Sequence, residues 1–109
     1  MEHHIQSSEK EIKKYASDYI TRNSSRLSLI TITRAETSPD EKRVVLHVSV
    51  LPQTAEGPAL DFLKRHQDDI RQHIIKHSKI RMMPWLRFTI DKGEKNRQLV
   101  DELLREDAE

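Results

Sequence analysis

Three short segments that alternate apolar and polar residues constrain the fold of this chain more than any other feature. They span residues 29–36, 44–51 and 86–90. Successive side chains of a β-strand point to opposite faces, so each segment is predicted to turn its apolar residues to one side. The predicted inward residues are Ile30, Ile32, Val44, Leu46, Val48, Val50, Leu86, Phe88 and Ile90, and the predicted outward residues are Thr31, Thr33, His47, Ser49, Arg87 and Thr89. We therefore expect a sheet with one apolar, helix-covered face and one polar, open face.

Apolar residues at helical spacing occur before, between and after these strands. The first helix is predicted from about Ser8 to Arg22, with Ser8 and Glu11 spaced as a capping box. A longer helical pattern occupies residues 60–76, and Asp91 is placed to cap a last helix. The predicted order of elements is α-β-β-α(α)-β-α.

The connections between the strands predict a mixed sheet. Ser38-Pro39-Asp40 is a turn signal, which makes the first two strands an antiparallel hairpin. The third strand must then be parallel to one of them, and the helical region before it provides the crossover. With 109 residues, the chain is expected to form one domain over residues 1–109, an α+β two-layer sandwich with frayed ends at residues 1–7 and 106–109.

A basic stretch is the strongest candidate for a binding site. The formal net charge of the chain is only +1, so charge has to be judged locally. Residues 71–87 contain no Asp or Glu. Their basic residues are Arg71, Lys76, Lys79, Arg81 and Arg87. Such a stretch is typical of a surface that binds nucleic-acid phosphates, and we predict that these five residues bind a nucleic acid; a solvated helix face is the alternative.

The remaining candidate residues give weaker indications of a function. His73 and His77 are spaced i, i+4 like a pair of metal ligands, but no third ligand is evident, so no metal or cofactor is expected. Trp85 is interpreted as packing at a sheet edge or under a helix rather than stacking on a base. There is no cysteine, and the only glycines are Gly57 and Gly93, so no cysteine nucleophile, nucleophile elbow or phosphate-binding loop is present and no enzyme is expected. The absence of cysteine, of a signal core and of a membrane-length apolar run favours a cytoplasmic protein.

Several motifs follow one another in a fixed order along the chain. The strand–turn–strand part contains Ile30-Thr31-Ile32-Thr33, Ser38-Pro39-Asp40 and Val48-Ser49-Val50-Leu51. The later part contains Ile70-Arg71, Ile80-Arg81, Pro84, Leu86, Phe88, Asp91 and Leu103-Leu104. Together, over about residues 8–105, these motifs resemble the ribosome-binding factor A family of bacteria.

The resemblance implies a KH-like fold of the type II order, α-β-β-α-kink-α-β plus a C-terminal helix. It implies a monomeric, non-catalytic assembly factor that binds the small (30S) ribosomal subunit and its rRNA during late maturation. It also implies a bend between residues 65 and 69, although residues 66–68 are His-Gln-Asp where the family has a small residue. Residues 2–4, Glu-His-His, stand where many members carry arginines.

A protein–protein adaptor with no RNA role is the alternative function. Such an adaptor would use the open sheet face or the acidic C-terminal tail. The two functions differ in their response to salt, because phosphate binding must weaken steeply as salt rises and an adaptor interface need not. A hydrolase is disfavoured by the lack of a nucleophile constellation.

Overall fold

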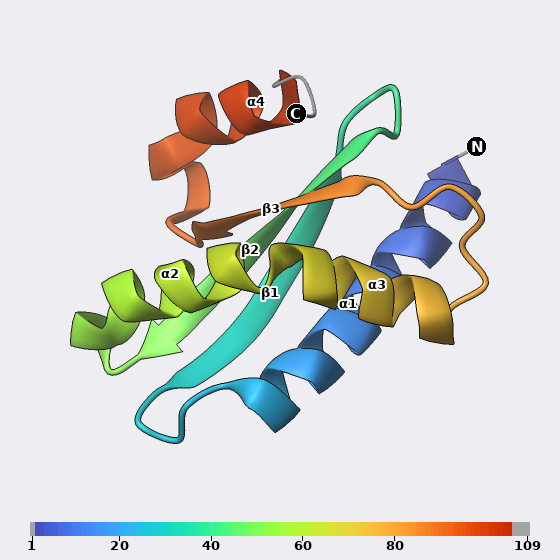
Figure 1. The fold of residues 1–109 in the computed structure, drawn as a ribbon. Helices are drawn as coiled ribbons and strands as arrows, with labels where there is room; N and C mark the ends of the chain where they lie inside the picture. Colours follow the sequence, from blue (N-terminus) through green and yellow to red (C-terminus); the bar gives the residue numbers. More distant parts are fainter. Residues whose placement is uncertain (1, 106–109) are drawn as a thin grey trace.

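The computed structural model of the protein describes residues 2–105, so the expectation for residues 106–109 lies outside the described part of the chain. The elements are α1 (Glu2–Asn23), β1 (Leu29–Thr37), β2 (Arg43–Leu51), η1 (Gln53–Ala55), α2 (Glu56–Arg65), α3 (Gln67–His77), β3 (Trp85–Ile90), η2 (Gly93–Asn96) and α4 (Arg97–Arg105). Apart from the two short 3₁₀ segments η1 and η2, this is the predicted order (Figure 1).

The strands form one mixed sheet in the order β1-β2-β3. β1 runs antiparallel to β2, with Ile30 opposite Val50, and β3 runs parallel to β2, with Leu86 opposite Val44. Helices α2 and α3 form the crossover between the two parallel strands. The predicted α+β fold with a three-stranded mixed sheet is therefore confirmed, and its element order is that of a type II KH-like domain.

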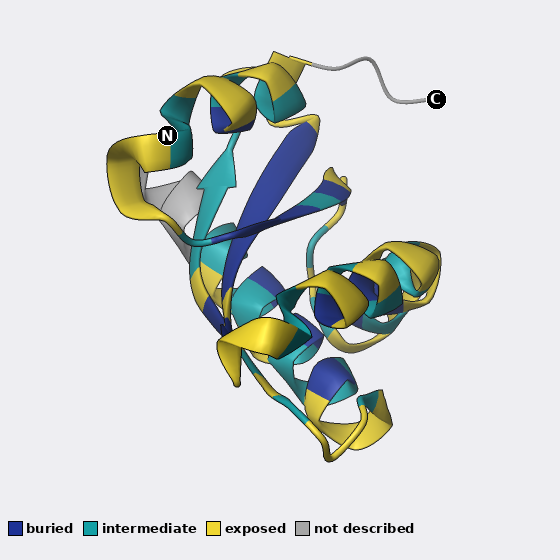
Figure 2. Ribbon diagram, turned by 90° about the vertical axis from the view of Figure 1, so that its left-hand side faces the viewer, coloured by how far each residue is buried: buried dark blue, intermediate teal, exposed yellow. Residues whose placement is uncertain are grey.

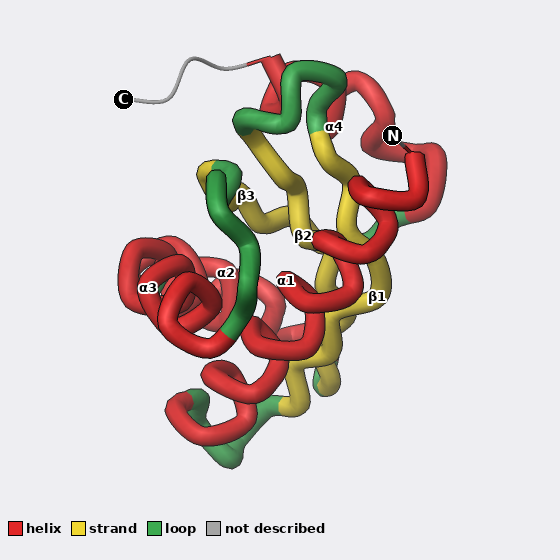
Figure 3. Tube along the Cα trace, turned by 90° about the vertical axis from the view of Figure 1, so that its right-hand side faces the viewer, coloured by secondary structure: helices red, strands yellow, loops and turns green. Residues whose placement is uncertain are grey.

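Helices α1, α2 and α3 cover one face of the sheet (Figure 3). The buried residues that they contribute include Ile12, Ala16, Ile20, Leu63, Ile70 and Ile74. The sheet contributes Ile32, Val44, Leu46, Val48, Val50, Leu86, Phe88 and Ile90, all predicted to point inward, while Ile30 is half-buried. Burying a large aliphatic or aromatic side chain stabilises by about 1.5–3 kcal/mol, so this layer is the main hydrophobic core of the protein.

The opposite face of the sheet is not open at its centre. Thr31, Thr33 and Ser49 are exposed as predicted. His47 and Thr89, also predicted to be outward, are only 0% and 6% exposed. Figure 2 shows that long parts of the sheet are coloured as buried. The prediction of an open face is wrong here because α4 packs against β2 on this side, where Val100 of α4 and Val45 of β2 are both fully buried. Val45 gives the middle strand an apolar residue on its second face, and α4 removes it from water.

The helical region is interrupted at His66, between the end of α2 and the start of α3, which confirms the predicted bend between residues 65 and 69. His66 has φ −99° and ψ 10°, outside the helical region. Asp68 and Asp69 lie in the first turn of α3, where the partial positive charge of a helix N-terminus favours carboxylates. The break therefore forms without a small residue at this position.

Two helix starts differ from the prediction. α1 begins at Glu2, so residues 2–7 are helical rather than frayed, and Ser8 lies inside the helix instead of capping it. The Asp91 side chain accepts a hydrogen bond from the backbone N–H of Gly93 at 2.9 Å, and Gly93 has φ +62°, a conformation that favours glycine. Asp91 thus stabilises the turn into η2, and α4 begins six residues later at Arg97.

Candidate nucleic-acid interface

Arg71 on α3 supports the loop of residues 78–84 from within. Its guanidinium donates hydrogen bonds to the backbone oxygens of Pro84 at 3.2 Å and Met83 at 2.7 Å. The same group lies 4.0 Å from the ring centroid of Trp85, which is 38% exposed. Both the cation and the indole are thus engaged within the protein, which agrees with the packing interpretation of Trp85. Arg71 positions the loop rather than offering a free charge to a phosphate.

Replacing Arg71 by alanine is expected to loosen this loop. Loss of the two hydrogen bonds and the ring contact should lower the free energy of unfolding by about 1–2 kcal/mol. Trp85 is the only tryptophan, so its fluorescence reports the change directly. We expect a red-shifted emission and easier quenching by acrylamide, with no change in the matched variant Gln72→Ala, whose side chain is exposed on the same helix. An unchanged Trp85 signal in Arg71→Ala would mean that the loop holds its position without Arg71.

Lys76, Lys79 and Arg81 are exposed and follow one another at the end of α3 and in the loop after it. Lys79 and Arg81 border a groove of about 600 Å³ between this loop, α1 and the β1–β2 turn. Its lining residues are Ser8, Glu11, Ile12, Thr37, Asp40, Glu41, Lys42, Lys79, Ile80, Arg81, Met82 and Pro84. We call this the 79–84 groove.

The 79–84 groove contains acids that the sequence of residues 71–87 lacks. The carboxylate of Glu11 accepts a hydrogen bond from the backbone N–H of Lys79 at 3.3 Å. A hydrogen bond from the Ser38 hydroxyl, 2.6 Å long, holds the pKa of the Asp40 carboxyl below its ordinary value. The groove is therefore electrically mixed, and the exposed cations at its rim and on α3 are the better phosphate-binding positions.

Arg87 is separated from the other predicted RNA-binding residues. Its neighbours Leu86 and Phe88 are buried in the main core, so Arg87 lies on the face of the sheet that α4 partly covers. Its side chain is half-buried and donates a hydrogen bond to the backbone oxygen of Leu86 at 2.9 Å. The structure thus leaves Lys76, Lys79 and Arg81 exposed within one short stretch of the chain. It engages Arg71 with Met83 and Pro84, and it puts Arg87 on the other face of the sheet.

A series of six rings along α1, α2 and α3 was not predicted from the sequence. The successive centroid distances are 5.9 Å for Tyr15–His77, 4.2 Å for His77–His73, 5.8 Å for His73–Tyr19, 5.9 Å for Tyr19–His66 and 4.4 Å for His66–Phe62. His73 is paired with Asp18 at 3.0 Å, and the Tyr19 hydroxyl is hydrogen-bonded to His66 at 2.8 Å. These contacts place His66 and His73 beside the core, where they pack against the side chains of α1. The i, i+4 spacings of Tyr15 and Tyr19 and of His73 and His77 were the signals of the series in the sequence.

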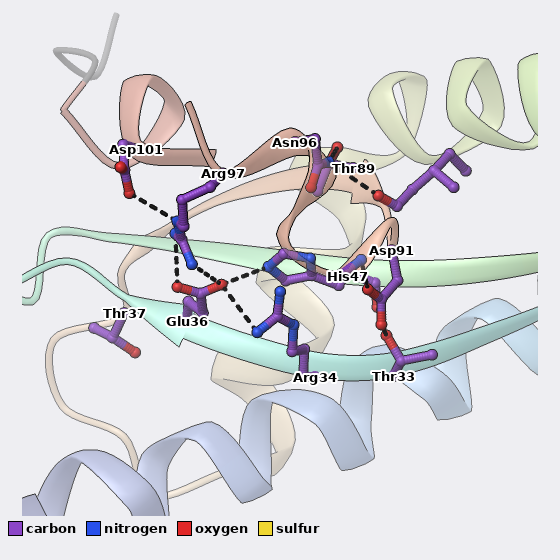
Figure 4. A network of polar contacts seen from close by, with 12 residues as sticks. Thr33, Arg34, Glu36, Thr37, His47, Thr89, Asp91, Asn96, Arg97 and Asp101 are labelled. Atoms are coloured by element: carbon purple, nitrogen blue, oxygen red, sulfur yellow. Dashed lines mark hydrogen bonds and ion pairs between the residues drawn. The ribbon is translucent and has the colours of Figure 1, made fainter. Parts of the chain in front are cut away.

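A polar network joins α4 to the sheet (Figure 4). The Arg97 guanidinium donates two hydrogen bonds to the Glu36 carboxylate, at 3.1 and 2.9 Å, and His47 Nε2 donates a third at 2.8 Å. Partial burial opposes the charge of Glu36, but Arg97 and His47 lower the pKa of its carboxyl below the ordinary value. Burial, reinforced by the charge of Arg34, lowers the pKa of His47, and Glu36 only partly offsets this effect. The network fixes the first residue of α4 above the middle of the sheet.

The lowered pKa of His47 predicts that acid weakens the fold. The unfolded chain takes up a proton at His47 near the ordinary pKa of 6.5, whereas the folded chain does so only at lower pH, so stability falls as pH drops below 6.5. Lowering the pH from about 7.5 to 5.5 should therefore lower the free energy of unfolding through this residue, and a further loss is expected below the ordinary pKa of 4.5 as Glu36 is protonated. The measurement is urea unfolding at several pH values. Its control is His47→Gln, which should lose less stability over the upper range; equal losses in both proteins would assign the pH dependence to other histidines.

Within the described part of the chain, no group of three or more His, Cys, Asp or Glu residues is arranged to hold a metal ion. None of the helices there is both long enough and apolar enough to span a bilayer.

The fold, with its broken helix pair before the parallel strand, defines a KH-like α+β domain of the type II order. The family model described as ribosome-binding factor A matches residues 4–104. The chain belongs to the ribosome-binding factor A family.

Individual relatives agree with this assignment. Ribosome-binding factor A of Methylobacterium sp. (strain 4-46) is 31% identical over 77 residues, which cover 71% of this chain and 55% of that protein. Ribosome-binding factor A of Rhodopseudomonas palustris (strain HaA2) is 31% identical over 80 residues, which cover 73% of this chain and 59% of that protein. The chain thus spans little more than half the length of the curated relatives that it matches.

Solved structures show the same fold. The crystal structure of ribosome-binding factor A from Thermus thermophilus matches with a TM-score of 0.68 at 20% identity, covering 78% of this chain and 93% of that one. A homology model of the Thermus thermophilus factor, fitted into the cryo-EM map of its 30S complex, matches with a TM-score of 0.65 at 20% identity, covering 74% of this chain and 88% of that one.

Proposed function

We propose that this protein binds the small (30S) ribosomal subunit and its rRNA during late subunit maturation, as a non-catalytic assembly factor of the cytoplasm. The observation that carries the proposal is the family match over residues 4–104. It is supported by the Thermus thermophilus relative, whose coordinates were fitted into a map of a 30S complex. The proposal carries the function of the curated relatives over to a chain that spans little more than half of their length.

The proposed rRNA contact consists of Lys76, Lys79 and Arg81. All three are exposed, so they can approach phosphates without rearranging the core. Arg71 contributes indirectly, because it holds the loop that presents Lys79 and Arg81. Arg87 joins this contact only if the RNA passes around the edge strand β3 to the other face of the sheet.

The proposal contains no catalytic step. Glu36 and Asp40 are the pair of carboxylates whose sequence spacing invites comparison with an acid–base pair. Glu36 is engaged by Arg97 and His47, and Asp40 by Ser38, so both serve local structure.

Sedimentation tests the proposal directly. Tagged protein is run with 30S, 50S and 70S fractions, and we expect it to sediment with free 30S subunits. Raising the salt concentration should release it steeply, because phosphate contacts exchange for counterions. Absence from the 30S fraction at low salt, or equal association with all three particles, would contradict the proposal.

The adaptor alternative is disfavoured on the sheet face. α4 already covers the centre of that face, and His47 and Val45 beneath it are fully buried. The acidic tail, the other surface that an adaptor would use, lies outside the described residues. Association that persists unchanged through the salt series would favour the adaptor.

A further inference from the structure

Three exposed leucines gather at the end of the sheet farthest from the 79–84 groove. Leu27, Leu29 and Leu51 are 88%, 62% and 64% exposed. Leu29 and Leu51 are directly opposite each other where β1 begins and β2 ends, and Leu27 lies in the turn that connects α1 to β1 (Figure 1). We call this region the leucine end. Clustered aliphatic side chains on a surface, unlike scattered ones, indicate an interaction site.

A hollow of about 480 Å³ lies at the leucine end. Its lining residues are Ile20, Thr21, Ser24, Ser25, Arg26, Leu27, Ser28, Leu29, Ile30 and Leu51. None of these residues is acidic, and Arg26 is exposed without a hydrogen bond or ion pair from its guanidinium to another described residue. The hollow therefore combines aliphatic and hydroxyl-bearing side chains with one available positive charge, which complements an extended segment that carries both apolar side chains and carboxylates.

Beside this hollow, the edge strand lacks the charges and bulges that usually protect an edge. β1 is an edge strand, because the sheet order is β1-β2-β3. Its pairing with β2 is regular from Leu29 to Ile32 and shifts only between Ile32 and Arg34. Residues 29–33 carry no charge, whereas Arg34 and Glu36 follow beyond the shift. Edge strands are usually protected by charges or bulges, and the first half of β1 has neither.

We propose that the leucine end and the first half of β1 dock an extended segment of a partner protein, which adds a strand to the sheet. Its apolar side chains would enter the hollow while its carboxylates face Arg26. RNA fits this end poorly, because aliphatic side chains offer no stacking surface and Arg26 is the only cation among the residues that line the hollow. A second copy of this chain is a less suitable occupant, because a two-fold contact would bring the positive charges of the two Arg26 side chains together. This inference does not depend on 30S binding.

The test is an NMR titration of the full chain with a capped eight-residue peptide that alternates valine and glutamate. We expect chemical-shift changes confined to the residues that line the hollow and to the first half of β1, which are residues 20, 21, 24–33 and 51. A peptide with lysine in place of glutamate should bind about threefold more weakly, as suits a single exposed ion pair. Failure of both peptides to bind, or shifts centred elsewhere, would overturn the proposal.

Variants at the leucine end and a control variant elsewhere test where the peptide binds. Leu51→Asp should abolish detectable binding, and Arg26→Glu should reverse the preference between the two peptides. Met82→Asp is the matched control, since Met82 is 87% exposed at the opposite end of the sheet, and it should bind like the wild type. Octauridine that produces the same shifts would reassign the leucine end to RNA, and concentration-dependent shifts without peptide would reassign it to self-association. Either result overturns the proposal.

Discussion

Replacing Lys76, Lys79 and Arg81 together by alanine is expected to lower the affinity for 30S subunits roughly 10²–10³-fold at about 0.1 M salt. Each phosphate contact contributes roughly 0.7–0.9 log units of affinity per log unit of salt, so the salt slope should also fall by about 2–3. Among single variants, Arg81→Ala should cost most, because a guanidinium can hold a phosphate through two parallel hydrogen bonds. The measurement is 30S binding over a salt series, with thermal melting to show that the variant is folded.

The matched control removes the same charge elsewhere. Lys64, Lys92 and Lys95 are exposed, and changing all three to alanine alters the net charge equally without touching the proposed contact. We expect only a small loss of affinity from this control. Equal losses in both triple variants would mean that 30S binding senses net charge alone. A folded Lys76/Lys79/Arg81 variant with wild-type affinity and salt slope would show that these residues form a solvated surface, and the contact would then be sought around Arg34 and Arg87.

The core layer of the fold was predictable from the sequence because its signals are local. The alternation in residues 44–51 assigns each side chain of β2 to a face, and the helical spacing of Leu63, Ile70 and Ile74 identifies the covering helices. The break at His66 was predictable only through the family resemblance, because propensity alone allows a continuous helix there.

The environment of the basic stretch was not predictable, because it depends on residues far away in the sequence. Glu11 and Asp40 come from α1 and the β1–β2 turn, and only the folded chain places them against residues 79–84. A stretch that is free of acids in the sequence is therefore not free of acids in space. The contacts of Arg71 with Met83 and Pro84 were likewise not predictable, and they give one predicted RNA-binding residue a structural role.

The position of α4 on the second face of the sheet was not predictable either, because it also depends on contacts between residues that are far apart in the sequence. Alternation indicates which side chains of β2 point away from the core, but not whether another element covers them. Glu36 and Arg97 are 61 residues apart in the sequence and meet only when α4 returns across the sheet. The apolar pattern of the last helix predicted that it would pack, and the choice of face depended on Val45, Val100 and the network around Glu36.

The surfaces proposed for RNA and for a partner protein lie at opposite ends of β1 and β2. The leucine end is where β1 begins and β2 ends, whereas Thr37 and Lys42 at the other ends of the hairpin border the 79–84 groove. A nine-residue strand spans about 26 Å at about 3.3 Å per residue, so both surfaces can be occupied at once. Variants at one end are therefore expected to leave binding at the other unchanged.

Replacing Glu36 by alanine is expected to lower the free energy of unfolding by about 2–3 kcal/mol at neutral pH. The change removes the acceptor of three hydrogen bonds and leaves the fully buried His47 facing a cation without the carboxylate between them. Glu36→Gln retains the shape and one acceptor oxygen, so its loss should be intermediate. Urea unfolding measures the loss, and hydrogen exchange should show faster opening of α4 than of α3.

The matched control for Glu36→Ala is Glu102→Ala, which removes an exposed carboxylate from α4 itself. Its effect should lie within about 0.5 kcal/mol of zero, as for most surface substitutions. If Glu36→Ala proved as stable as this control, with unchanged exchange in α4, the buried Val100 contact alone would anchor the helix. The larger loss that we expect would instead show that the second face of the sheet is closed mainly by a polar network, because Val100 is the only residue of α4 within the described chain that is fully buried.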